Sequence, residues 1–148
     1  MKENSGVKLQ WMEWNLLFAI AGVKHIWGFD FDTTSMKQQE TIMCIHRMLK
    51  KEMLTIKDDK ICISEKYKEL TDGIKNAEQV WFVETLLEDQ KQKSIVYAGE
   101  KLFIVETVPC QKRFYQISVM TKEHWLNELK EKDGYYVTSE YKAVKESC

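Results

Sequence analysis

The sequence SIVYAGEKLFIVETV, residues 94–108, and the sequence FYQISVM, residues 114–120, belong to the stretch from Val80 to Met120 that decides the fold. Runs of β-branched and aromatic residues in this stretch have the length of strands and are separated by polar turns. They show no clean alternation of apolar and polar residues, which indicates a sheet with both faces at least partly covered. We therefore predict an antiparallel meander of about four strands, with turns at residues 88–93 and 98–100.

The segment after the meander has the pattern of a helix. Thr121 precedes KEHWLNELKEK, in which Trp125, Leu126 and Leu129 recur at helical spacing. We expect Thr121 to cap a helix that packs these side chains on the sheet. The final residues, which include YYVTSEY at 135–141, are read either as a short strand or as a docked tail.

The segment before the meander favours helices. We expect residues 1–8 to be a loose lead, followed by a helix over residues 9–21 that is buried around most of its circumference. Gly22 then stands where a left-handed helix end is common. The short segment VKHIWGF, residues 23–29, is expected to form one turn of helix.

A second helix is predicted from about Met36 to Glu52, because Ser35 and Gln38 stand at capping-box spacing. A hairpin around Asp58-Asp59 follows, and Ser64 is the expected N-cap of another helical pattern. The hairpin residues expected to be buried are Leu54, Ile56, Ile61 and Ile63. In the helix predicted from about Met36 to Glu52, the residues expected to be buried include Ile42, Ile45 and Met48.

The charge of the chain is balanced. Its 22 Lys and Arg residues stand against 23 Asp and Glu residues, so no net field favours a polyanion or an acidic membrane. The N-terminal residues show no apolar targeting segment, and the longest apolar run, residues 16–21, is far shorter than a membrane span. We expect a cytoplasmic protein with no membrane insertion.

The residues that usually carry chemistry are scattered. The widely spaced cysteines fit a reduced cytosolic setting with structural or incidental thiols; they are Cys44, Cys62, Cys110 and Cys148. No group of His, Cys, Asp or Glu has metal-ligand spacing, and the sequence contains no common nucleotide, hydrolase or calcium motif. We therefore expect no metal, no cofactor and no catalysis.

One pair of carboxylates leaves acid-base chemistry open. Glu84 and Glu106 lie in expected strands, and facing each other across the sheet they would form the kind of pair that acid-base catalysis uses. Glutamates at the solvated face or rim of a sheet are the commoner arrangement, and we prefer that interpretation.

A capped helix followed by a hairpin, from Ser35 to Ile63, is the element order of winged-helix domains. The sequence MLKKEMLTIKDDKICISEKY, residues 48–67, resembles the part of such a domain in which a recognition helix leads into a charged wing. A DNA-binding member would place the helix in the major groove and the wing on phosphate. The residues that would contact nucleic acid are Lys37, Arg47, Lys50, Lys51, Lys57 and Lys60. The acidic residues that offset them are Glu40, Glu52, Asp58 and Asp59.

The whole layout, a helix-rich winged unit followed by a meander and a helix, is similar to uncharacterised small proteins of Gram-positive bacteria. It is also similar to the EspG kind of type VII secretion chaperone, although no single motif carries the likeness. This resemblance implies a cytosolic, non-enzymatic adaptor that holds a helical secretion substrate on an exposed sheet or helix surface.

We conclude from the sequence that the fold is α+β, with a helical winged-helix-like half, residues 1–76, packed with an antiparallel meander and covering helix, residues 77–148. We expect a non-catalytic protein-binding adaptor or chaperone-like protein of a secretion or regulatory system. A winged-helix DNA-binding transcription regulator is the alternative, and a small-molecule sensor is the third interpretation. The residues expected to contact a partner protein are Trp11, Met12 and Trp14.

Overall fold

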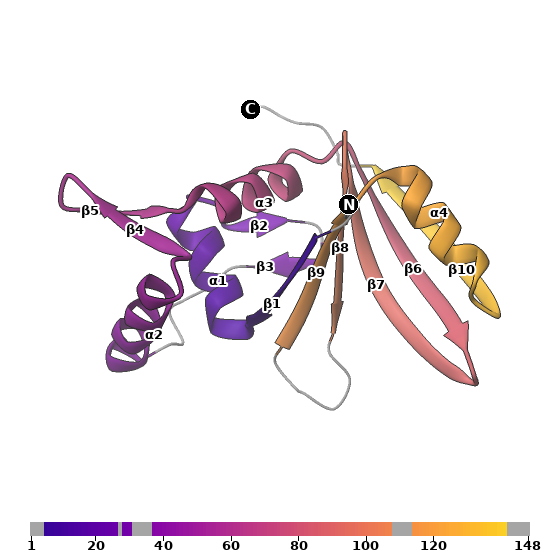
Figure 1. Cartoon of the computed structure of the whole chain (residues 1–148), viewed down its shortest axis with the longest axis horizontal. Helices are drawn as coiled ribbons and strands as arrows, with labels where there is room; N and C mark the ends of the chain where they lie inside the picture. Colours follow the sequence, from indigo (N-terminus) through magenta and orange to yellow (C-terminus); the bar gives the residue numbers. More distant parts are fainter. Residues whose placement is uncertain (1–4, 27, 31–36, 108–113, 142–148) are drawn as a thin grey trace. The chain divides into compact units, whose positions relative to one another are not determined.

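A computed structural model describes residues 5–26, 28–30, 37–107 and 114–141 of the chain. The chain divides into two compact units (Figure 1). Residues 10–75 form the first, which we call the helical unit, and residues 1–9 with 76–148 form the second, which we call the sheet unit. The sequence also suggested a boundary near residue 76, but the first residues of the chain group with its C-terminal half.

The sheet unit is built on a six-stranded sheet with the order β1-β9-β8-β7-β6-β10 (Figure 1). All pairs from β9 to β10 are antiparallel. The strands are β1 (Ser5–Gln10), β6 (Gln79–Leu87), β7 (Gln90–Ala98), β8 (Leu102–Thr107), β9 (Phe114–Met120) and β10 (Gly134–Tyr141). The predicted meander is therefore confirmed as β6 to β9, and YYVTSEY is a strand, not a docked tail.

Two details of the predicted sheet are wrong. Residues 5–8 are not a loose lead but part of β1, which lies beside β9. The turn between β6 and β7 is limited to Glu88 and Asp89, whose positive φ angles of 52° and 65° match the two-residue turns that suit twisted strands. The charged residues after them continue as β7, so composition overestimated the length of this turn.

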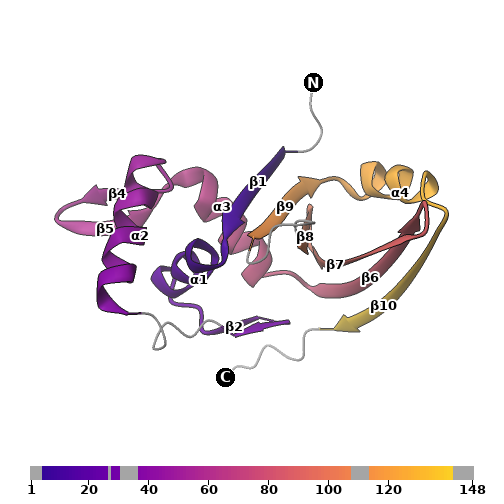
Figure 2. The ribbon, with the colours of Figure 1, turned by 90° about the horizontal axis from the view of Figure 1, so that it is seen from below.

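Helix α4 (Lys122–Lys130) lies over one face of the sheet (Figure 2). As predicted, Thr121 caps it, because the Thr121 hydroxyl accepts a hydrogen bond of 3.1 Å from the His124 N–H. Trp125 stacks on Trp81, with ring centroids 5.2 Å apart. Leu126, which the helical spacing also assigned to the sheet, is instead 42% exposed.

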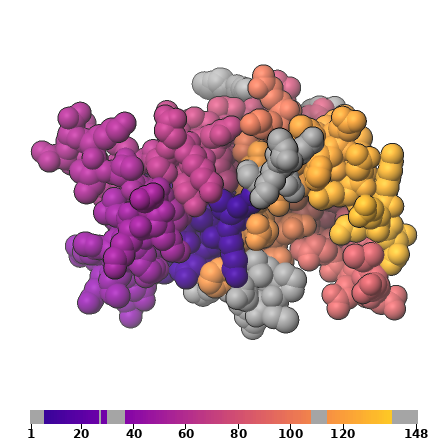
Figure 3. Space-filling view, viewed as in Figure 1, coloured from indigo at the N-terminus to yellow at the C-terminus, as the bar shows by residue number. Residues whose placement is uncertain are grey.

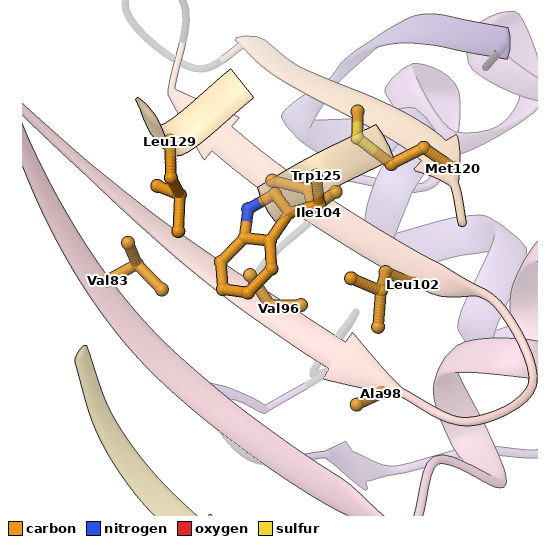
Figure 4. Packing of buried hydrophobic residues seen from close by; sticks show 8 residues of the cluster. All are labelled: Val83, Val96, Ala98, Leu102, Ile104, Met120, Trp125 and Leu129. Atoms are coloured by element: carbon orange, nitrogen blue, oxygen red, sulfur yellow. The ribbon is translucent and has the colours of Figure 1, made fainter. Parts of the chain in front are cut away.

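The buried apolar cluster of the sheet unit lies between α4 and the sheet (Figure 4). Its members are Val83, Val96, Ala98, Leu102, Ile104, Met120, Trp125 and Leu129, with Trp81 packed against them. The strand residues in this cluster come from β6, β7, β8 and β9, so the single helix ties four strands together.

The helical unit contains three helices and two small hairpins among its described residues. Helix α1 is buried over most of its surface, as predicted, from Glu13 to Phe18. The elements are α1 (Trp11–Ile20), β2 (His25–Ile26), β3 (Phe29–Asp30), α2 (Gln38–Lys50), β4 (Leu54–Lys57), β5 (Lys60–Ile63) and α3 (Glu65–Lys75).

The hairpin of β4 and β5 confirms the predicted turn at Asp58-Asp59, where both residues have positive φ angles. Ile56 and Ile61, which face each other across it, are 61% and 40% exposed, so the prediction that they are buried is wrong. The alternation of apolar and polar residues shows which side chains lie on the same face of a hairpin. That face is buried only if another element packs against it. The tip of this hairpin stands out at the surface in Figure 3.

Other local predictions for the helical unit are corrected. VKHIWGF does not form a turn of helix, because β2 and β3 pair as a hairpin in which Gly28 has a φ of 93°. Helix α2 has Lys37 as its N-cap without a side-chain hydrogen bond, and Ser35 lies outside the described residues. The Ser64 hydroxyl is buried and finds no hydrogen-bond partner among the described residues, so it caps nothing in α3.

The buried stripe of α2 is predicted only in part: Met48 is buried as expected, but Cys44 is buried as well and Ile42 is 48% exposed. The order of α2, β4 and β5 is the one that the winged-helix resemblance implies. That order alone does not confirm a winged helix, and the resemblance stays a prediction. The coarser statement, a mixed fold of helices and an antiparallel sheet, is confirmed.

Replacing Trp125 by alanine should lower the free energy of unfolding by about 3–5 kcal/mol, because the truncation opens a cavity between α4 and the sheet. Leu126→Ala on the exposed side of the same helix is the control and should have a far smaller effect. Urea unfolding of both variants measures the difference. Equal unfolding midpoints would show that α4 does not hold the sheet together.

Candidate functional site

The aromatic surface predicted at the start of the chain is only partly exposed. Trp14 is 1% exposed, and its ring meets Phe18 and Phe29 edge to face at centroid distances of 4.9 and 5.1 Å. Trp11 and Met12 are half-buried. Trp14 is therefore a core residue that a partner protein cannot reach, and the predicted surface loses one of its two tryptophans.

A buried carboxylate organises the helical unit near these aromatic residues. Glu13 is 1% exposed, and its carboxylate forms a 2.7 Å ion pair with the Lys51 ammonium. The same carboxylate accepts a 2.9 Å hydrogen bond from the Gln10 N–H. Arg47 donates to the Gln10 side-chain oxygen at 3.4 Å. The start of α1 is thus bound to the end of α2 by charges and hydrogen bonds.

This network includes two of the basic residues that the sequence assigned to nucleic-acid binding. Lys51 and Arg47 bind partners within the helical unit. Lys57 and Lys60 face each other beside Asp58-Asp59. Of the six candidates, only Arg47 is half-buried, and Lys51, although exposed, has its ammonium paired with Glu13. The exposed candidates without an ion pair among the described residues are Lys37, Lys50, Lys57 and Lys60. The exposed acidic residues Glu52, Asp58 and Asp59 lie close to Lys50, Lys57 and Lys60 in the chain and offset their charge, which weakens attraction to phosphate.

The described residues offer no metal centre, and the buried thiol among them is not activated. No group of three or more His, Cys, Asp or Glu side chains among them could hold a metal ion. Burial raises the pKa of the Cys44 thiol, against the lowering effect of nearby Arg47, so this thiol is a poor nucleophile. Cys62 is half-buried, whereas Cys110 and Cys148 lie outside the described residues. In the same described ranges, no helix has the length and apolar character of a membrane span.

The two carboxylates considered for acid-base chemistry do not meet. Glu84 is the register partner of Lys93, with which it forms a 3.7 Å ion pair, whereas Glu106 is the partner of Ser94. Ser94 is also the partner of Val83, a member of the cluster under α4. Because neighbouring residues of a strand point to opposite faces, Glu84 and Glu106 lie on opposite faces of the sheet. The carboxylate pair is therefore excluded.

Glu106 instead belongs to a polar recess on the α4 face of the sheet. One row of register partners crosses the strands β6, β7, β8 and β9 and consists of Val83, Ser94, Glu106 and Gln116. Thr85 and Gln92 are partners in the next row on the same face. These residues lie at one end of the sheet, beyond the apolar cluster. A recess of about 460 Å³ opens there. The side chains that line it are Thr85, Leu87, Glu88, Gln90, Gln92, Glu106, Thr107, Gln116 and Lys132.

The loop between α4 and β10 is fixed at the edge of this recess. The Asp133 N–H donates a 2.8 Å hydrogen bond to the Leu86 carbonyl. The Glu88 N–H donates to the Asp133 carboxylate at 2.8 Å. Lys132, directly before Asp133, is thereby placed in the wall of the recess.

Burial raises the pKa of Glu106, and this desolvation outweighs the lowering effect of the Lys132 ammonium. The carboxylate of Glu128, on α4, raises the pKa further. Within the described residues, the Glu106 carboxylate has neither a hydrogen bond nor an ion pair. The recess therefore contains a carboxylate whose charge is only partly compensated.

The sheet unit also has an exposed strand edge. β10 is the last strand of the sheet, and Tyr135, Tyr136 and Val137 are 56%, 67% and 38% exposed. Residues 134–138 include no charged side chain. The opposite edge strand, β1, carries the exposed Lys8. Lysine is one of the residues that commonly protect a strand edge from pairing, so the two edges differ in their protection.

Comparison with family models and with curated proteins found no match to this chain. The residues that matter most in the sheet unit, Glu106 with its neighbours and the β10 edge, were not identified as binding sites from the sequence. The polar residues at 85, 92, 94, 106 and 116 would have indicated the recess once the strand register was known. In a meander, the end of one strand lies beside the start of the next, which brings these positions together.

Replacing Lys51 by alanine should lower the free energy of unfolding by about 1–3 kcal/mol, because the buried Glu13 carboxylate loses its charged partner. Lys50→Ala, one residue earlier and exposed, is the control and should unfold at nearly the wild-type denaturant concentration. Chemical denaturation followed by tryptophan fluorescence measures both. A Lys51→Ala protein as stable as the control would contradict the role of this ion pair.

Replacing Glu106 by glutamine should raise the melting temperature at neutral pH. A carboxyl group with a raised folded-state pKa binds its proton more tightly in the folded protein, so its contribution to stability declines as pH rises through that pKa. The difference should disappear at a pH well below about 4, where the carboxyl is protonated in both states. Melting curves across this pH range test the prediction. A lower melting temperature for Glu106→Gln at neutral pH would contradict it.

Proposed function

We propose that this protein is a non-catalytic adaptor that binds an extended segment of a partner protein along the β10 edge of its sheet. The observation that supports the proposal is the uncharged, exposed edge formed by Tyr135, Tyr136 and Val137. An edge strand offers unpaired backbone N–H and C=O groups, which a partner strand can use to extend the sheet. Exposed tyrosines next to those groups add apolar contact area at little entropic cost.

An extended segment suits this edge better than the helical substrate implied by the resemblance to type VII secretion chaperones. The backbone groups of a helix already bind each other, so a helix cannot pair with a strand edge. The partner segment expected here carries β-branched or aromatic residues at alternate positions, facing Tyr135 and Val137 on one side of the sheet. Exposed Leu86 and Leu87 at the adjacent end of β6 extend the apolar surface.

Selection of extended peptides from a random display library on the immobilised protein tests this function. The peptides obtained should have alternating apolar residues, and their binding should slow hydrogen exchange at β10 amides. Tyr136→Lys should weaken their binding by about tenfold or more, because a desolvated lysine opposes strand pairing. Leu126→Lys on α4 is the matched control and should bind normally.

Two results would contradict the proposal. One is peptide binding that Tyr136→Lys leaves unchanged. The other is a concentration-dependent dimer that Tyr136→Lys abolishes, since that would make a second copy of this chain the occupant of the edge.

A further inference from the structure

The strand floor of the polar recess beyond α4 offers hydrogen-bond acceptors. The Gln92 side-chain nitrogen donates to the carbonyls of Lys93 and Thr107, at 3.2 and 3.4 Å, which leaves its oxygen as the acceptor. The Glu106 carboxylate can only accept hydrogen bonds when it is ionised. Both side chains line the recess, so a bound molecule would find acceptors on the strand floor.

Among the described residues that line the recess, acidic side chains outnumber basic ones. Glu88 and Glu106 line it, and Lys132 is the only cation among the described residues of its lining. Glu128 of α4 adds a further negative field at Glu106. Lys132 by itself does not offset the desolvation of the Glu106 carboxylate. A second cationic donor placed beside Glu106 would regain the electrostatic and hydrogen-bond energy that burial has removed.

The size and lining of the recess limit what could occupy it. A volume of about 460 Å³ falls within the range of small-molecule sites. Among the described residues that line it, Leu87 is the one apolar residue, and the others carry polar or charged groups together with carbon atoms that also face the recess. The fitting ligand is therefore small and polar and carries hydrogen-bond donors.

We propose that this recess binds a small organic cation, an alkylammonium or guanidinium group, with the Glu106 carboxylate as its principal contact. The Gln92 side-chain oxygen accepts a further hydrogen bond from the ligand. The source of the cation is either a free amine or the basic side chain of a peptide. This inference does not depend on the β10 edge, because Glu106 lies on β8, separated from β10 by β7 and β6.

Titration of the ¹⁵N-labelled protein with three probes tests the proposal. Hexamethylenediamine represents the free amine, N-acetylargininamide represents a basic side chain, and hexanediol is the uncharged counterpart of the diamine. At least one cation should produce saturable shifts at the side-chain amides of Gln92 and Gln116, and hexanediol should produce none. The cation that binds more tightly identifies the source.

The variants Glu106→Gln and Glu84→Gln remove the same charge from opposite faces of the sheet. Glu106→Gln should weaken binding by about tenfold or more, because a charged hydrogen bond is lost. Glu84→Gln should bind like the wild type. Affinity should also fall as Glu106 becomes protonated at lower pH, with Lys132, Glu88 and Glu128 as the other charged groups that face or line the site.

Equal weakening by Glu106→Gln and Glu84→Gln would overturn the proposal, since it would reveal only attraction by the overall charge. Equal binding of hexanediol and the diamine would also overturn it, as would the lack of saturable shifts with both cations. Loss of folding does not complicate the result, because Glu106→Gln is expected to be at least as stable as the wild type at neutral pH.

Discussion

The stacking of Trp125 on Trp81 attaches one short helix to a much longer sheet, and this mismatch of lengths shapes the sheet unit. Helix α4 has 9 residues, which corresponds to about 14 Å. Strands β6 and β7 also have 9 residues each, but a strand of that length extends about 30 Å. One helix therefore covers only part of the face. The distribution of side chains agrees with this partial cover, because apolar residues lie under α4 and polar residues occupy the strand ends beyond it.

The helical unit depends on a different interaction, the pairing of the buried Glu13 carboxylate with the Lys51 ammonium and the Gln10 N–H. A carboxylate removed from water needs such partners, and it ties α1 to α2 through charge and hydrogen bonds as well as apolar contact. Arg47 and Lys51, which the sequence assigned to a nucleic-acid-binding surface, take part in this structural network. The exposed Ile56 and Ile61 also give the adjacent hairpin an apolar surface, which is a poor match for phosphate.

The sequence predicted the elements whose signals are local. Strands β6 to β9, the Thr121 cap and the Asp58-Asp59 turn follow from composition and short-range spacing. It did not predict β1, whose pairing with β9 joins residues about a hundred positions apart. The recess was missed for a similar reason, since Glu106 and Gln116 become neighbours only through the strand register. Trp14 was assigned to a surface because helical spacing does not reveal which face the hairpin of β2 and β3 covers.

The division of the α4 face into a covered apolar part and an open polar part is the claim on which the recess depends. Paramagnetic relaxation by a neutral soluble gadolinium chelate tests it most directly, because the relaxation reports how closely water-borne molecules approach each side chain. The side-chain amides of Gln92 and Gln116 should relax strongly, whereas the methyl groups of Val96 and Ile104, 0% and 5% exposed, should be protected. Similar relaxation of all four side chains would contradict this division of the sheet face.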